Sequence, residues 1–95
     1  MRVYSEEQVQ SIERCIIELL EKKRESQNVS RVEWGRRCYE GECANPQAKI
    51  QAIVGKNTVG GKPKRISVGD LIKLSQALEA DPAHVLAAVL LAFPE

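Results

Sequence analysis

The sequence predicts an all-α fold, a compact domain of five helices. The chain of 95 residues suffices for one domain, since folding units commonly hold about 100–150 residues. Of these residues 43% are hydrophobic but only 4% are aromatic. The core must therefore consist of Leu, Ile, Val and Ala, which suits packed helices better than a β-sandwich. The apolar residues also recur at spacings of three and four, as on one face of a helix.

The first helix is expected over residues 6–26 and the second from residue 31 to about residues 39–41. The apolar positions are Val9, Ile12, Ile16, Leu19 and Leu20 in the first, and Val32, Trp34 and Cys38 in the second. Ser5 is the expected N-cap of the first helix, and Asn28 ends it. Ser30 is the N-cap of the second, and Glu33 three residues later has the spacing of a capping box.

The remaining three helices begin at residues that favour helix starts. Asn45 followed by Pro46 predicts the third helix, which stops at Gly55. Ser67 is expected to cap the fourth. Asp81 and the proline after it open the fifth, which Pro94 ends. The apolar side of these helices comprises Ile50, Ile53 and Val54, then Val68, Leu71, Ile72 and Leu78, then Val85, Leu86, Val89, Leu90, Leu91 and Phe93.

The charges are distributed unevenly along the chain. Residues 1–21 carry two basic and five acidic side chains, residues 22–73 carry twelve basic and five acidic, and residues 74–95 carry three acidic and none basic. A basic middle between acidic ends is typical of a protein with one face that meets an anionic polymer. The alternative is an ordinary solvated surface.

No constellation in the sequence points to an enzyme, a metal site or a cofactor. An odd number of cysteines, three, favours reduced thiols over a disulfide framework. Cys38 and Cys43 are too far apart for the Cys-x-x-Cys spacing of zinc sites. Whether these two thiols sense the redox state depends on their exposure, so this role stays open. Gly61-Lys62 lacks the first glycine and the hydroxyl residue of a phosphate-binding P-loop. With no signal peptide and no apolar run near the roughly 20 residues of a membrane span, we expect a cytoplasmic protein.

The fourth and fifth helices resemble those of a known family. Residues 66–86 read ISVGDLIKLSQALEADPAHVL, a leucine-rich helix, a short break and Asp-Pro opening the next helix. This pattern is similar to the Cro/lambda-repressor-like helix-turn-helix DNA-binding domains, the XRE family, and the order of elements fits over residues 9–92. The resemblance implies a single domain over residues 1–95. It would contain a helix-turn-helix motif at about 30–55, a basic loop at 56–66 and C-terminal helices over 67–93.

The resemblance implies that the third helix lies in the major groove of DNA. Trp34 then takes the apolar position of the second helix, and Gly35 takes the place where the family usually has alanine against the third helix. The turn from residue 39 to 44 departs from the family, because it is longer and carries Glu40 and Glu42. Either these acids point away from DNA or the motif is degenerate.

A helical wheel, at about 100° per residue, places Ile50 and Ile53 inward and Ala48, Ala52 and Gly55 outward. Gln47 and Gln51 flank this small-residue face on one edge, and Lys49 and Lys56 on the other. Such a face can approach base edges closely, with Gln pairing to adenine and Lys reaching phosphate or guanine. The alternative is that the small residues pack against another helix. The predicted DNA-binding residues are Asn45, Gln47, Ala48, Lys49, Gln51 and Ala52, with Lys56, Lys62, Lys64 and Arg65 from the basic loop.

The C-terminal helix suggests a protein partner, because it is apolar nearly all round. Leu90, Leu91 and Phe93 are the expected homodimer interface, with Phe93 left exposed for the partner; burial in the chain's own core is the alternative. We therefore expect a bacterial or phage transcription regulator, a repressor that binds double-stranded DNA as a homodimer. The second hypothesis is a protein-interaction module of the same fold, such as an antitoxin that pairs with a toxin.

Overall fold

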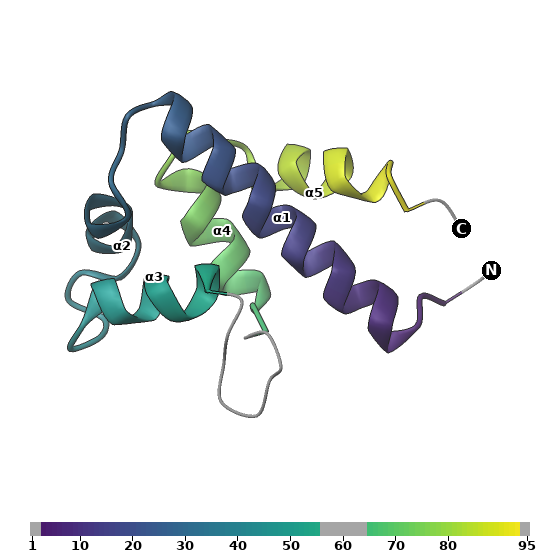
Figure 1. Cartoon of the computed structure of the whole chain (residues 1–95), viewed down its shortest axis with the longest axis horizontal. Coiled ribbons are helices and arrows are strands. Elements are labelled where there is room, and N and C mark those ends of the chain that lie inside the picture. The colour runs from purple at the N-terminus through teal and green to yellow at the C-terminus, as the bar shows by residue number, and fades with distance from the viewer. Residues whose placement is uncertain (1–2, 56–64, 94–95) are drawn as a thin grey trace.

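The computed structural model describes residues 3–55 and 65–93, and these residues form five helices and no strand. The helices are α1 (Glu6–Ser26), α2 (Arg31–Tyr39), α3 (Pro46–Val54), α4 (Val68–Gln76) and α5 (Pro82–Leu90). The predicted all-α class is confirmed. Figure 1 shows α2 and α3 at one end of the molecule and the start of α1 and the end of α5 at the other, with α4 crossing behind α1.

All five predicted N-caps are confirmed. Their side chains each accept a hydrogen bond from a backbone N–H in the first turn, at Ser5, Ser30, Asn45, Ser67 and Asp81. The predicted capping box at Ser30 forms only in part. Ser30 accepts from the Glu33 amide at 3.1 Å, but the Glu33 carboxylate lies 3.4 Å from Nε of Arg37 instead of returning to the cap. Asn28 ends α1 as predicted, with φ of 59°.

The core lies where α1 crosses the shorter helices. Its fully buried hydrophobic side chains are Ile17, Leu20, Trp34, Ile50, Ile53, Leu74 and Leu78. Trp34 is the one aromatic ring among them, and its Nε1 donates to the carbonyl of Leu74 at 3.1 Å. The prediction for α1 holds in part: Ile12, Ile16 and Leu20 are buried, but Leu19 is 38% exposed and Ile17 takes its place in the core. In α2, Val32 is also exposed, at 42%, against the prediction.

The inward face of α4 differs from the prediction. Val68 is 74% exposed and Ile72 is 38% exposed. The buried positions of the helix are Leu71, Leu74 and Ser75. Leu78 is buried as expected but follows the end of the helix at Gln76. The prediction from apolar character alone is therefore wrong for Val68 and Ile72. The side of the helix that faces the core carries Leu74 and Ser75 instead.

The two ends of the described chain meet. The Tyr4 hydroxyl donates to the carbonyl of Phe93, and both side chains pack against the core. This contact joins the segment before α1 to the segment after α5. Within residues 3–55 and 65–93, none of the helices has the length and apolar character needed to cross a membrane.

Candidate functional site

The close packing of α2 on α3 positions the candidate site. A methyl group added to Gly35 would lie 2.9 Å from Cγ1 of Ile50 and 2.9 Å from the carbonyl oxygen of Pro46. Ile50 and Ile53 are both 0% exposed. Two predictions are confirmed here: Gly35 packs against the third helix, and the two isoleucines are its core positions. The inner face of α3 is therefore fully committed to the fold, which leaves its outer face as the candidate site.

The outer face of α3 is open. Gln47, Ala48, Gln51 and Ala52 are exposed, so in the described chain the two alanines do not pack against another helix. Asn45 is exposed as well, and its Oδ1 accepts from the Ala48 amide at 3.0 Å. Since α3 carries no acidic residue, the surface consists of amides and methyl groups beside a helix N-terminus.

Lys49 lies on the edge of this face and is held by the neighbouring helices. Its Nζ is 4.7 Å from the centroid of the Tyr39 ring and 4.0 Å from Oδ1 of Asp70. The Tyr39 hydroxyl donates to the same Asp70 oxygen at 2.8 Å. The prediction that Lys49 flanks the small-residue face is confirmed, but the ammonium group already has an aromatic and a carboxylate neighbour.

The pKa values of this cluster follow from its burial and its hydrogen bonds. Burial acts to raise the pKa of Asp70, but hydrogen bonds from the Ser67 amide and the Tyr39 hydroxyl outweigh it, so the pKa lies below its usual value. Burial, and then the hydrogen bond to Asp70, raise the pKa of Tyr39. Tyr39 therefore remains a neutral donor and Asp70 a charged acceptor at neutral pH.

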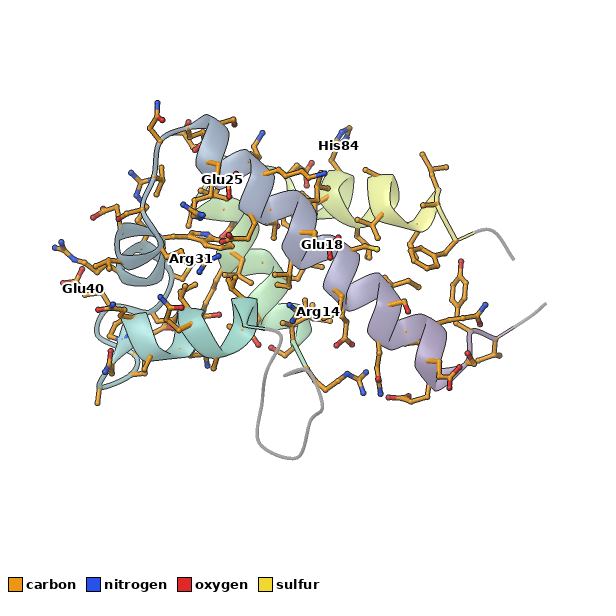
Figure 2. All side chains as sticks on the ribbon, viewed as in Figure 1. Arg14, Glu18, Glu25, Arg31, Glu40 and His84 are labelled. Atoms are coloured by element: carbon orange, nitrogen blue, oxygen red, sulfur yellow. The ribbon has the colours of Figure 1, made fainter. Side chains whose placement is uncertain are left out.

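The two acids of the long turn take different directions. Glu42 forms an ion pair with Lys73 of α4, whose Nζ lies 5.5 Å from the centroid of the Tyr39 ring. Glu42 thus turns toward α4. Glu40 is exposed, and Figure 2 shows it projecting outward at the edge of the molecule beyond α2. The α2–α3 turn therefore carries one acid that Lys73 neutralises and one that solvent surrounds.

Arg65 does not lie in an open basic strip as the sequence suggested. Its Nε is 2.8 Å from Oε1 of Glu13, and its guanidinium also pairs with Glu6. The hydrogen bond from Arg65 outweighs partial burial and lowers the pKa of Glu13, which also accepts from the Ile66 amide. The reason for the difference is the acidic face of α1, 52 residues away in sequence from Arg65. The predicted contacts of Lys56, Lys62 and Lys64 lie outside the described residues.

At the C-terminal end, the exposed apolar side chain is that of Leu91 and not, as predicted, that of Phe93. Leu91 is 84% exposed, whereas Phe93 and Leu90 are half-buried and pack against the core. A groove follows the seam between α1 and α5, in two parts of about 380 and 240 Å³, and Ala92, the residue after Leu91, lines the smaller part. Both parts share Leu19 and Ala88 in their lining. This end of the molecule thus has an exposed apolar side chain, Leu91, and a groove whose lining mixes apolar residues with charged ones such as Lys22 and Glu18.

The thiol of Cys38, for which the sequence leaves a redox role open, is shielded from solvent. Cys38 is buried, its Sγ lies 3.5 Å from the carbonyl oxygen of Lys73, and burial raises its pKa to about 12. A protonated, buried thiol does not react readily. Cys43 is half-buried. Among the residues that the structure describes, no three His, Cys, Asp or Glu side chains gather as ligands for a metal ion.

Sequence reasoning missed two residues near α3. Lys73 was counted as basic but not placed at the site, and Arg14 was not singled out at all. Arg14 donates from α1 to the carbonyls of Ile53 and Val54 at the end of α3. Nothing in the local pattern marks either residue, because their partners lie 31 to 40 residues away.

Searches of protein-family models, of curated proteins and of solved structures give no match to this chain.

Proposed function

We propose that this protein is a transcription regulator that binds double-stranded DNA in a sequence-specific manner, with α3 in the major groove. One observation carries the proposal. Ile50 and Ile53 on the inner face of α3 are fully buried, while Gln47, Ala48, Gln51 and Ala52 are exposed at the end of the molecule that lies away from the start of α1 (Figure 1). A helix held rigidly with an uncharged amide and methyl surface suits the reading of base edges. The protein would be a repressor without enzymatic activity, acting in the cytoplasm.

Each exposed side chain of α3 has a role that matches its chemistry. Gln47 and Gln51 can each pair with the N6 and N7 atoms of adenine, and Ala48 and Ala52 can contact thymine methyl groups. Asn45 stands at the positive end of the helix dipole, where backbone phosphate is favoured. Because α3 bears no acidic residue, nothing on the helix itself repels phosphate.

The acidic turn is compatible with this proposal. The pair between Glu42 and Lys73 cancels one negative charge near α3. A phosphate that approached Lys49 and Lys73 would compete with Asp70 and Glu42 for the two ammonium groups. We therefore expect weaker phosphate binding than in a protein with free lysines, so that base contacts account for more of the affinity.

We propose that two copies pair through the C-terminal end of α5. Leu91 is the exposed knob. The groove that Leu19, Ala88 and Ala92 line together with Glu18 and Lys22 would receive the knob of a second copy. A two-fold arrangement can place the knob of each copy in the groove of the other, with Leu90 and Phe93 behind it, because a two-fold interface uses the same patch twice. A dimer would bind a palindromic site.

A protein-interaction module of the same fold is the second candidate. The observation that favours it is the pairing of Lys49 and Arg65 with carboxylates of the chain itself, which leaves the outer face of α3 uncharged. An antitoxin that binds its toxin through this face would have the same surface. Co-purification of a second chain from the native source, lost on substitution of Gln47 and Gln51, would support this candidate.

The test of the DNA proposal is selection from a randomised duplex pool, followed by affinity measurements on the selected site. We expect a palindromic consensus and a dissociation constant at least about 1000-fold lower for the site than for random duplex. Gln51→Ala should lose about 1–3 kcal/mol of discrimination at one base position per half-site. The matched control Gln76→Ala changes an exposed glutamine on α4 and should leave the preference intact. Failure to enrich any sequence would refute the proposal.

A further inference from the structure

We infer that Arg14 is a positioning residue, which fixes the C-terminal end of α3 and so the placement of Gln51 on the bases. The effect on base contacts rests on the proposed DNA-binding function of α3. The contact of Arg14 with the end of α3 does not depend on that function. Arg14 lies in the middle of α1 and would not touch DNA itself. Its effect would pass through the backbone of α3.

The guanidinium of Arg14 caps α3 with two hydrogen bonds. Nη1 donates to the carbonyl of Ile53 at 2.9 Å, and Nη2 donates to the carbonyl of Val54 at 3.0 Å. Figure 2 shows Arg14 on α1 near the end of α3. No carboxylate in the described chain lies within 4.0 Å of this guanidinium. Its charge is therefore directed at the helix end, where a cation is favoured by the dipole.

Within the described residues, no group of α3 itself or of Gly55 after it satisfies these two carbonyls. The last turn of the helix contains no basic side chain. Gly55 follows with φ of −63° and ψ of 144°, an extended conformation rather than the left-handed one of a glycine cap. Its amide donates to Gln51 and not to Ile53 or Val54. Since the last carbonyls of a helix need partners from outside the helix, Arg14 satisfies two of them.

The two ends of α3 are held by different contacts. At the N-terminal end, Gly35 of α2 packs against the Pro46 carbonyl, one residue before Gln47. At the C-terminal end Arg14 binds Ile53 and Val54, two and three residues after Gln51. Base-edge hydrogen bonds tolerate only small displacements. Loss of the Arg14 contacts should therefore disturb the contact of Gln51 more than that of Gln47.

The experiment compares the full-length protein with Arg14→Met, which keeps much of the side-chain length but has no donor, and Arg14→Lys, which keeps the charge. Arg31→Met is the matched control, because Arg31 lines the same cleft as Arg14 but pairs with Glu21. The first readout is amide hydrogen exchange at residues 53–55, with Leu20 and Trp34 reporting global stability. The second is base preference at each position of the selected DNA site.

We expect exchange at residues 53–55 to rise on the order of tenfold in Arg14→Met, beyond any change at Leu20 and Trp34, with partial rescue in Arg14→Lys. We also expect preference to fall at the position read by Gln51 and to persist at that read by Gln47. Arg31→Met should show neither effect. If Arg14→Met is unfolded, Arg14→Lys alone provides the comparison.

Two results would overturn the inference. One is unchanged exchange at the end of α3, which would mean that Arg14 does not hold it. The other is an equal loss of preference at every base position, which would assign Arg14 a general structural role. If the unmodified protein selects no DNA sequence, the proposed function fails, and the exchange measurement alone decides whether Arg14 anchors α3.

Discussion

Replacing Gly35 with alanine should destabilise the protein, although alanine is the better helix former. Glycine in a helix interior costs about 0.5–1 kcal/mol relative to alanine, so propensity alone favours the substitution. The structure opposes it. The new methyl group would meet Cγ1 of Ile50 and the carbonyl oxygen of Pro46, both at 2.9 Å. Overpacking of this kind typically costs about 1–3 kcal/mol.

The packing cost should exceed the propensity gain at this position. Ile50 is 0% exposed and lies within the core, and the Pro46 oxygen belongs to the backbone of α3, which cannot rotate away as a side chain can. The contact is relieved only if α3 moves away from α2. We therefore expect a net loss of about 1–2 kcal/mol in the free energy of unfolding, or about 4–16 °C in the melting temperature for a domain of this size.

Urea denaturation measures this effect, with Gly69→Ala as the control. A methyl group at Gly69 would lie 3.6 Å from Oγ of Ser67, an ordinary contact, in the first turn of α4. Gly69→Ala should therefore stabilise the protein by about 0.5–1 kcal/mol, so the two variants change stability in opposite directions. A Gly35→Ala protein as stable as the unmodified one would refute the close approach of α2 and α3.

Three further predictions concern single side chains. The hydroxyl of Ser75 is fully buried and has no hydrogen-bond partner among the described residues. Ser75→Ala should therefore leave the free energy of unfolding, measured in urea, unchanged or raise it by up to about 2 kcal/mol. A clear loss of stability would show that the hydroxyl is bonded. The pKa of Glu13 is lowered by Arg65, so the stability from this carboxylate is present above its unfolded pKa of about 4.3 and is lost as the pH falls through the folded pKa. Glu13→Gln should accordingly flatten the decline of stability below about pH 5 in thermal melts, and an unchanged decline would contradict this. Glu42→Gln should release Lys73 from its ion pair so that Lys73 can bind phosphate. The salt dependence of DNA binding should then steepen by about one released counterion. Weaker DNA binding by this variant would contradict the prediction and indicate that Glu42 contacts DNA directly.

Helix positions could be predicted from the sequence because their signals are local. Ser5, Asn45 and Ser67 cap helices through atoms three residues away. The isoleucines of α3 identify its inner face because they share a side at helical spacing. The exposed face with Gln47 and Gln51 follows from them by geometry, so the main part of the candidate site was also within reach.

The rest depends on contacts between residues far apart in the sequence. Arg65 belongs to a basic run, and only the fold brings Glu13 beside it. Arg14 reads as an ordinary surface residue of an amphipathic helix until α3 ends next to it. Leu91 and Phe93 are both apolar and both follow the end of α5 at Leu90. Phe93 packs on the core near Tyr4, whereas Leu91 remains exposed. Composition and periodicity contain no information about these pairings.

The most direct test of the central claim is to measure binding to random duplex DNA by fluorescence anisotropy across a salt series. The proposed function predicts measurable binding at low salt that weakens as salt rises, with a smaller slope than unpaired lysines at the positions of Lys49 and Lys73 would give. It also predicts that Gln47→Ala and Gln51→Ala leave this non-specific binding nearly unchanged, because they act on bases and not on phosphate. Absence of binding even at low salt would contradict the claim and direct the search to a protein partner for α3.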